Sequence, residues 1–229
     1  MLSNHIKAAW RNLLKQKQFT FLNLVGLSSG LACVILIFLW VNDEIHIDKF
    51  NRNNSRLYQV LKNSPDGDGS IITRETTQGL LSQELLKSYP EIEYAVSVKK
   101  EGELGVLSVD QKLIKASWEF ADKDFFHVFS YRLMEGNASR ILADPYGVLV
   151  SDKLARKLFN TTKNIIGKTI SWDAGSEFSG SYMISGIFEA PPTNASDQFD
   201  LVFSYALYVE KEKGGMGDIN FWGSNSICT

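Results

Sequence analysis

Residues that commonly carry out chemistry are scarce in this sequence. It contains two cysteines, three histidines and five prolines among 229 residues. Cys33 lies inside an apolar run and Cys228 lies near the end of the chain, which argues against an internal disulfide. His5, His46 and His127 do not form the His-Glu-x-x-His spacing of a zinc site. The sequence therefore predicts no catalytic residues, no metal ligands and no cofactor, and it favours a protein that is not an enzyme.

Charged residues are absent from the whole interval between Lys17 and Asp43. Within it, residues 19–41 include 14 Leu, Ile, Val or Phe residues. At about 1.5 Å per residue, a helix over this range is roughly 35 Å long, which exceeds a hydrocarbon core of about 30 Å. A cleaved signal peptide is the alternative, but its apolar region is shorter, and here the most apolar part comes last. We therefore predict an uncleaved transmembrane helix over residues 19–41.

Acidic residues are absent from the first 18 positions, where basic residues recur. Apolar residues repeat there at helical spacing, and Lys7, Arg11 and Lys15 follow one another every four residues. This pattern predicts an amphipathic basic interfacial helix over residues 1–18, with a plain cytoplasmic extension of the membrane helix as the alternative. The candidate membrane-interface residues are Trp10, Lys7, Arg11, Lys15 and Lys17.

The charge balance predicts an orientation. The basic residues before the span place the N-terminus in the cytoplasm by the positive-inside rule, so the rest of the chain is extracytoplasmic. The formal net charge is −2 and the first 18 residues contribute +4, so the remainder carries −6. This acidic balance argues against nucleic acid as a partner and leaves membrane lipid as the expected contact of the N-terminal part.

Small residues form two pairs within the predicted span. Gly26 and Gly30 lie four residues apart, and Ser29 and Cys33 repeat that spacing beside them. Such pairs let two helix backbones approach closely, so we predict that this face packs on another membrane helix. A chance occurrence is the alternative, because Gly is common in membrane helices.

The part after the span is predicted to be an α+β domain. Residues 42–229 are enough to form their own core. We expect a strand-helix-strand lobe at about 50–100 and a strand-rich lobe at about 101–205, whose boundary near residue 100 is approximate. Asp43, Glu44 and Asp48 are expected to form a solvated acidic exit from the membrane. The expected strands and helices lie at 56–61, 78–88, 93–98, 104–109, 112–118, 124–128, 148–150, 153–159, 165–172, 182–188 and 199–205.

No closing strand or helix is expected after residue 205. The chain there becomes polar and rich in Gly. This abrupt end predicts a truncated domain, that is, a fragment of a longer protein.

Two further patterns carry no chemistry. Gly167-Lys168-Thr169 is similar to the end of a phosphate-binding loop, but position 162 is Thr162 instead of Gly and a strand is expected to follow. Aromatic residues are frequent between 118 and 131, where core packing is the default interpretation and a ligand pocket is the alternative.

Several short motifs resemble, in their order and spacing, the first part of a known family. The N-terminal motifs are Ala9-Trp10-Arg11-Asn12-Leu13, Asn23-Leu24-Val25-Gly26-Leu27, Gly30, Asp43-Glu44 and Asp48-Lys49-Phe50. The downstream motifs are Arg56-Leu57-Tyr58, Tyr89-Pro90-Glu91, Ala121-Asp122, Phe125-Phe126, Val128-Phe129, Ile166-Gly167-Lys168-Thr169 and residues 197–203. Together they resemble Bacteroidetes-type ABC transporter permeases of the MacB/FtsX family, with residues 42–229 as a MacB-like periplasmic core domain.

The resemblance implies a mechanical function in the bacterial inner membrane. Such a permease would form a homo- or heterodimer, pair with a cytosolic ABC ATPase and move its periplasmic domain for efflux or envelope export. It would bind no nucleotide itself, and a periplasmic adaptor or envelope protein could be a partner. The alternative is a single-span anchored extracytoplasmic sensor or partner-binding protein. An anchored envelope enzyme is the third hypothesis, which no catalytic set supports.

Overall fold

The computed structural model describes residues 5, 11, 15–137, 140–215 and 222–228, with the backbone alone from residue 213 onward. The chain divides into two compact units, Met1–Ile47 and Asp48–Thr229. The predicted interfacial helix over 1–18 lies mostly outside the described residues and stays a prediction.

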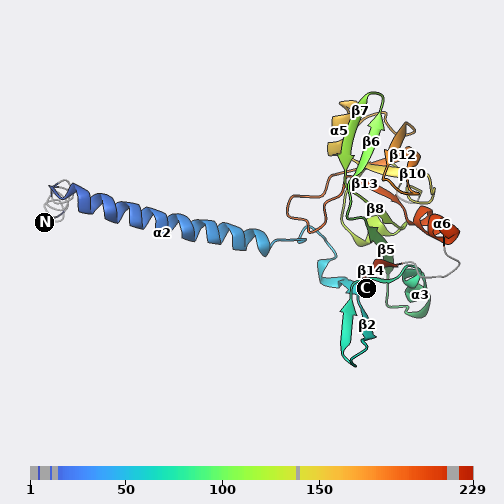
Figure 1. Ribbon diagram of the computed structural model, residues 1–229, viewed down its shortest axis with the longest axis horizontal. Helices are drawn as coiled ribbons and strands as arrows, with labels where there is room; N and C mark the ends of the chain where they lie inside the picture. Colours follow the sequence, from blue (N-terminus) through green and yellow to red (C-terminus); the bar gives the residue numbers. More distant parts are fainter. Residues whose placement is uncertain (1–4, 6–10, 12–14, 138–139, 216–221, 229) are drawn as a thin grey trace. The chain divides into compact units, whose positions relative to one another are not determined.

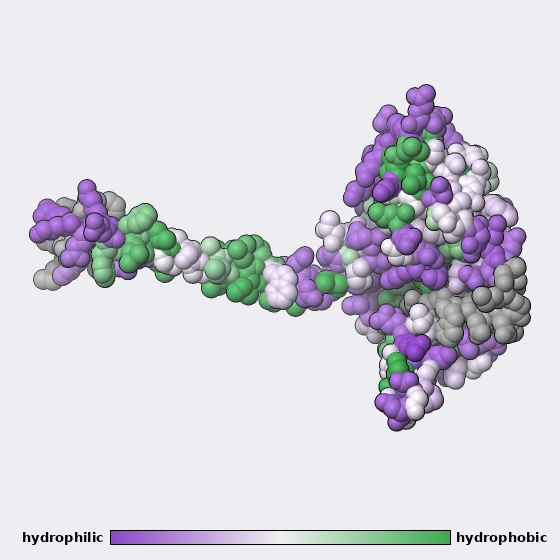
Figure 2. Space-filling model, viewed as in Figure 1, coloured by the Kyte–Doolittle hydropathy of each residue, from purple (hydrophilic) through white to green (hydrophobic). Residues whose placement is uncertain are grey.

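The first unit contains one long helix, α2 (Lys17–Glu44). It encloses the predicted span of 19–41, and none of its residues is buried within the protein. Apolar side chains surround most of its length (Figure 2), as expected for a helix that is buried in lipid rather than against a core. In the described part of the chain, α2 is the one helix long and apolar enough to cross a membrane, judged by length and composition.

The second unit is a mixed sheet with helices on its faces (Figure 1). Its strands are hydrogen-bonded in the order β1-β14-β5-β8-β13-β10-β12-β11-β6-β7, with β4 on β14 and β9 on β12. Along this order β8 with β13 and β10 with β12 are parallel, and the other neighbours are antiparallel. In this order the strands are β1 (Leu57–Val60), β14 (Trp222–Cys228), β5 (Tyr94–Lys100), β8 (Trp118–Ala121), β13 (Leu201–Ser204), β10 (Gly147–Ser151), β12 (Gly180–Phe188), β11 (Thr169–Asp173), β6 (Gly105–Val109), β7 (Lys112–Ala116), β4 (Thr77–Gln78) and β9 (Leu133–Glu135).

The helices and a separate hairpin complete this unit. The hairpin of β2 (Lys62–Pro65) and β3 (Ile71–Arg74) forms its own two-stranded sheet and extends from the domain (Figure 1). The helical elements are the 3-10 turn η1 (Asn54–Arg56), α3 (Leu81–Ser88), α4 (Phe125–Val128), α5 (Asp152–Phe159) and α6 (Tyr205–Gly215).

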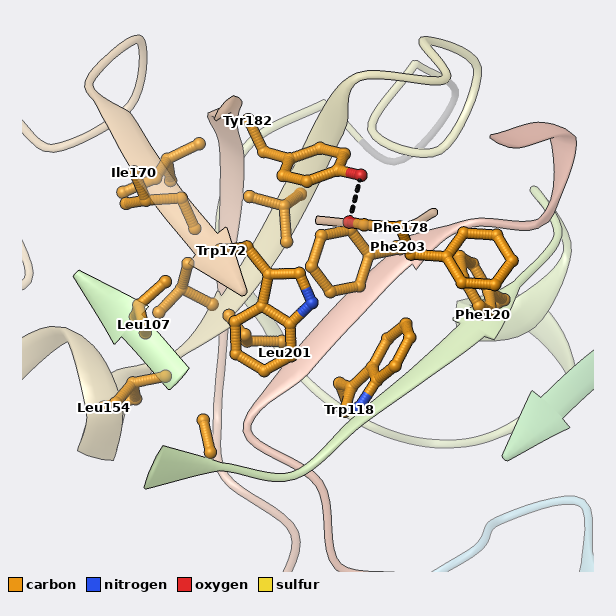
Figure 3. Close-up of a cluster of buried hydrophobic side chains, with 14 of the residues drawn as sticks. Leu107, Trp118, Phe120, Leu154, Ile170, Trp172, Phe178, Tyr182, Leu201 and Phe203 are labelled. Carbon is orange, nitrogen blue, oxygen red and sulfur yellow. Dashed lines mark hydrogen bonds between the residues drawn. The ribbon is translucent and has the colours of Figure 1, made fainter. Parts of the chain in front are cut away.

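The sheet has a hydrophobic core on each face, because successive side chains of a strand point to opposite sides. Leu201 and Phe203 of β13 face one core, which α5 and α6 cover, whereas Val202 faces the other, which α4 covers. Rings dominate the first core (Figure 3): Trp118 packs on Trp172 at 5.5 Å between ring centroids, and Tyr182 Oη donates to Phe178 O at 2.7 Å.

Most expected elements are present, with shifted ends. The Ser151 cap is confirmed, since its Oγ accepts the Leu154 N–H at 3.2 Å and begins α5. The strand expected from residue 165 begins only at Thr169, because Gly167 turns the chain at φ +84°. The strand expected over 112–118 is two strands, β7 and β8, and Tyr205 begins a helix instead of ending a strand.

The expectation of no closing element was wrong. Helix α6 and strand β14 follow residue 204, and β14 lies inside the sheet between β1 and β5. Hydrophobic periodicity does not detect a polar strand such as β14. Backbone hydrogen bonds to the neighbouring strands on both sides hold it in the sheet. The sheet also continues past the expected lobe boundary, since Lys100 of β5 pairs with Glu119 of β8, so the division into two lobes stays a prediction.

Candidate functional site

The first residues of the folded unit, Asp48–Asn53, are called the junction segment here because they follow directly on the helical unit in the chain. Asp48 has φ +56°, a conformation that Asp tolerates better than most residues. Its Oδ1 accepts the Ser196 N–H at 2.9 Å, and its own N–H donates to Asn194 O at 3.2 Å. Asp48 is therefore bound to the loop before β13 and is only partly exposed, whereas Asp43 and Glu44 are exposed, as the sequence predicts.

The junction segment is also bound to α4 and to the loop after it. The buried Asn51 accepts the Ser130 N–H on its Oδ1 at 3.0 Å. The Arg52 N–H donates to Ser130 Oγ at 2.8 Å, and Asn53 Nδ2 donates to His127 O at 3.2 Å. Five hydrogen bonds thus hold the junction segment on α4 and on two loops that are far away in the sequence.

Comparison with known proteins identifies the family. The family model for the MacB-like periplasmic core domain matches residues 20–221. The chain belongs to this family. A search of curated proteins found no match.

Solved structures share the fold of this MacB-like domain. A permease-protein domain from Porphyromonas gingivalis is 21% identical, with a TM-score of 0.61 over 78% of this chain and 74% of that one. The periplasmic region of MacB from Actinobacillus actinomycetemcomitans is 16% identical, with a TM-score of 0.53 over 76% and 74%. The extracellular domain of the noncanonic ABC-type transporter YknZ from Gram-positive bacteria is 13% identical, with a TM-score of 0.51 over 76% and 83%. The chain is thus a MacB-like periplasmic domain of the kind found in ABC transporter permeases, and with its apolar helix it is suited to membrane anchoring.

A cavity of about 310 Å³ adjoins the junction segment of this MacB-like domain, and we call it the junction pocket. Lys100 on its wall forms an ion pair with Asp197, with 2.8 Å between Nζ and Oδ2. Burial lowers the pKa of Lys100, but the hydrogen bond and charge of Asp197 outweigh it and the net shift is upward. Phe129 and Tyr131 also line the pocket. Some of the aromatic residues between 118 and 131 therefore border a cavity, as the alternative interpretation of this cluster requires.

Glu119 is a buried acid next to this pocket. It is 1% exposed, and the charged side chains close to it are Asp197 and Lys100. Burial raises its pKa well above the usual value, the charge of Asp197 and a hydrogen bond with that side chain raise it further, and Lys100 opposes the shift. Burial, followed by the charges of Glu119, Asp197 and Asp48, also raises the pKa of Tyr131. Sequence reasoning missed Glu119. The available signal was an acidic residue between two aromatic residues, Trp118 and Phe120, in a stretch that was interpreted only as an aromatic cluster.

A second buried carboxyl has a structural role. Asp122 accepts the Ser97 N–H at 2.9 Å and the Asp124 N–H at 3.1 Å, so it joins β5 to the start of α4. Burial raises its pKa to about 6 against these two hydrogen bonds. Both of its oxygens are satisfied by the fold.

The predicted helix-packing residues lie along one stripe of α2. The Ser29 Oγ donates to Gly26 O at 3.0 Å, so its hydroxyl is satisfied within the helix. A methyl group added at Gly26 or Gly30 would meet no atom within 4 Å, and Cys33 is exposed as a free thiol. The stripe is therefore open to a partner, and its packing stays a prediction.

The predicted interface residues are described only in part. Arg11, Lys15 and Lys17 are exposed. Lys7 and Trp10 lie outside the described residues. In the described part of the chain, no three His, Cys, Asp or Glu side chains are grouped so that they could hold a metal ion.

Proposed function

We propose that this chain belongs to the transmembrane subunit of an ABC transporter that works by mechanotransmission. Family membership supports a permease, and the apolar helix α2 supports a membrane anchor. Four basic residues before the apolar stretch of residues 19–41 and an acidic domain after it support a cytoplasmic N-terminus and a periplasmic domain in a bacterial inner membrane. Movement of this domain would drive efflux or envelope export.

The observation that carries this proposal is the attachment of the junction segment. A helix that moves in the membrane transmits force to its domain only if the residues that connect the two are bound to the domain. The bonds of Asp48 to Ser196 and Asn194, and of Asn51 to Ser130, supply that attachment. A freely hinged linker would instead dissipate the movement.

The partners follow from the same proposal. A permease of this family would work with a cytosolic ABC ATPase, and a symmetric ATPase pair calls for two permease chains, either identical or different. The open stripe of Gly26, Gly30, Ser29 and Cys33 is a suitable contact for another membrane helix. A periplasmic adaptor or envelope protein would meet the domain outside the membrane.

The test measures whether ATP moves the domain. The tagged protein is purified from its native membrane with the ATPase that accompanies it and is placed in nanodiscs. In a Cys33→Ser, Cys228→Ser background, a spin label at Leu113→Cys, an exposed position on β7, reports the distance between two copies. We expect ATP to change this distance. Asp48→Gly, which keeps the backbone conformation but removes the bond to Ser196, should reduce the change while ATP hydrolysis continues.

Asp110→Gly is the matched control, because Asp110 has φ +53° in the turn between β6 and β7 and is remote in sequence from the junction segment. It should leave the distance change intact. Absence of an accompanying ATPase, or a distance that ATP does not alter, would reject the mechanical function and favour the single-span sensor.

A further inference from the structure

The β2–β3 hairpin lies apart from the two hydrophobic cores of the domain. It forms its own two-stranded sheet and extends from the domain (Figure 1), and none of the residues 61–76 is buried. The side chain of Ile71 is 71% exposed. An isolated two-stranded hairpin is marginally stable in water, so a further strand beside it would stabilise it.

The register of the hairpin shows which backbone groups point inward. The Asp66 N–H donates to Ser70 O at 2.7 Å next to the turn, and Ser64 pairs in register with Ile72. Hydrogen-bonded and non-hydrogen-bonded pairs alternate along an antiparallel ladder. Ser64 and Ile72, one step beyond a non-hydrogen-bonded pair, therefore bond to each other across the hairpin.

The residues on either side of Ile72 present their backbone groups to the outside. Ile71 pairs with Pro65 and Thr73 pairs with Asn63, both at non-hydrogen-bonded positions. Thr73 Oγ1 donates to Asn63 Oδ1 at 2.9 Å, which fits a pair of this kind because its side chains lie closest. No backbone bond from outside the hairpin reaches Ile71 or Thr73 in the described part of the chain.

The two edges of the hairpin differ in their capacity to pair. On β2 the outward positions are Asn63 and Pro65, and Pro65 has no N–H to donate. On β3 both outward residues, Ile71 and Thr73, keep a donor and an acceptor, and both are β-branched residues that favour strands. The β3 edge is thus the one suited to accept another strand.

This edge is complementary to itself. When two copies of β3 meet antiparallel with Ile72 opposite Ile72, Ile71 of each copy lies opposite Thr73 of the other. Each of these facing pairs can exchange both backbone hydrogen bonds, because their N–H and C=O groups point outward. The two Ile72 side chains then form the closely spaced pair at the centre, on one face of the joined sheet.

Charge complementarity favours the same pairing. The turn carries Asp66 and Asp68, and Arg74 ends β3. In the self-complementary register, Arg74 lies opposite Ser70 of the second copy, whose neighbour across its own hairpin is Asp66. These side chains share a face, so the acidic turn of each copy meets the arginine of the other, twice by symmetry. Glu75, the next residue, lines the junction pocket instead.

We propose that the β3 edge is a contact surface for a second copy of this chain, and that the two hairpins join as one antiparallel sheet in the order β2-β3-β3-β2. Strands this short give a small interface, so the pairing depends on two copies held in one membrane, where tethering raises their effective concentration. In this respect it rests on the proposed function, which places two permease chains side by side.

The test is disulfide cross-linking of the full chain in its native membrane, in a Cys33→Ser, Cys228→Ser background. Facing residues of a non-hydrogen-bonded pair are about 4.5 Å apart between Cα atoms, a distance that a disulfide spans. Ile72→Cys should therefore give a cross-linked dimer on oxidation. Two Ile71 residues are offset along the strands by more than about 7 Å, so Ile71→Cys should give at least about tenfold less product.

Exposure alone predicts the opposite order, because Ile71 is exposed and Ile72 is half-buried. More product from Ile71→Cys than from Ile72→Cys would therefore overturn the register and the proposal with it. A disulfide of Ile72→Cys with a different protein would also overturn it.

Two proline variants test the edge, each combined with Ile72→Cys. Thr73→Pro removes an outward N–H of β3 and should abolish most of the dimer. Asn63→Pro is the matched control, because it removes the outward N–H of β2 and loses the same side-chain bond between Asn63 and Thr73. It should leave cross-linking intact. Equal loss in both variants, or loss only in Asn63→Pro, would contradict pairing through β3.

A charge reversal tests the complementarity in the same background. Arg74→Glu should lower the yield of dimer about threefold, as expected for exposed ion pairs. Adding Asp66→Arg should restore the yield, a gain that an unfolded hairpin could not show. A yield that ignores both changes would reject the contribution of these charges to the contact.

Cross-linking through the native Cys33 of α2 separates this contact from the proposed function. If Cys33 links two chains but Ile72→Cys does not, the hairpin contact is refuted and the pair of permease chains stands. If neither position links two chains, the pairing of permease chains fails as well.

Discussion

Among single residues, Glu119 is the acid that the fold accommodates least well. It lies between Trp118 and Phe120 of β8, is 1% exposed and is close to the charged side chains of Asp197 and Lys100. Because burial and Asp197 raise its pKa, the folded state holds a proton that the unfolded chain releases at lower pH. Such a group contributes stability below its unfolded pKa, and that contribution is lost as the pH rises through its folded pKa.

Glu119→Gln should therefore flatten the pH dependence of stability. We expect the wild-type free energy of unfolding to fall between pH 5 and pH 8 by up to about 1.4 kcal/mol per pH unit where only the folded state keeps the proton. Denaturant titrations at several pH values measure this slope. Asp122, whose pKa is raised to about 6, contributes in the same direction at the acidic end and remains in the variant. If the slope in Glu119→Gln equals the wild-type slope, Glu119 does not retain the proton that this prediction requires.

Gly105 is a second residue of interest, because its surroundings leave no room for a larger side chain. A methyl group at this position in β6 would collide with the Trp172 ring, which is 1% exposed in the first core. Trp172 cannot move aside, since it also packs on Trp118 and Phe203.

Gly105→Ala should destabilise the domain by about 1–3 kcal/mol, the usual cost of overpacking a core. Gly102→Ala is the matched control, because a methyl group there meets no atom within 4 Å. Thermal unfolding of both variants checks the difference. Equal melting temperatures for the two would show that the Trp172 ring has room to shift.

At the scale of elements, α2 and the central strands are both apolar but for different reasons. The central strands β8, β10 and β13 are buried on both faces by helices and neighbouring strands. α2 has no such cover within the protein, which is typical of a helix that contacts lipid or another helix. Length separates the two cases, because α2 has 28 residues and each of these strands has at most five.

The small-residue stripe of α2 makes a testable contact. In a Cys228→Ser background, Cys33 is the sole cysteine and lies on the stripe with Gly26 and Gly30. We expect oxidation in native membranes to cross-link two chains through Cys33, and Gly30→Leu to abolish most of this product by blocking close approach. Ser28→Leu, a similar enlargement on the opposite side of the helix, should leave cross-linking unchanged. Cross-linking that survives Gly30→Leu would place the contact on another face.

At the scale of the whole molecule, β14 joins parts of the chain that are distant in sequence. It pairs with β1, β4 and β5, and through β5 it extends the sheet that carries both cores. Removing it would leave β1 without its sheet neighbour and would turn β5 into an edge strand.

Ending the chain after Gly215 should therefore loosen one end of the domain. We expect fast hydrogen exchange at β1 amides, which β14 pairs at Leu57–Val60, and slow exchange retained at β10 and β12. Replacing residues 64–72 by a short Asn-Gly turn is the control, because the β2–β3 hairpin is a separate sheet. Slow exchange at β1 after loss of β14 would show that this strand is not needed for the fold.

How far the sequence could predict the site depends on how many positions along the chain separate the interacting residues. The α5 cap was predictable because Ser151 binds a backbone group three residues away. Asp48 was expected in solvent because its partner Ser196 lies 148 positions further along the chain. Glu119 shows the same limitation, since its environment comes from Lys100 and Asp197 on separate segments.

The sequence by itself determined the long apolar helix, the α+β class and the resemblance to MacB-like permeases, because these depend on composition, local periodicity and the order of motifs. Only the tertiary structure decided the attachment of the junction segment, the place of β14 inside the sheet and the burial of Glu119. Each of these arises from hydrogen bonds, charges and burial between segments that the chain brings together only when it folds.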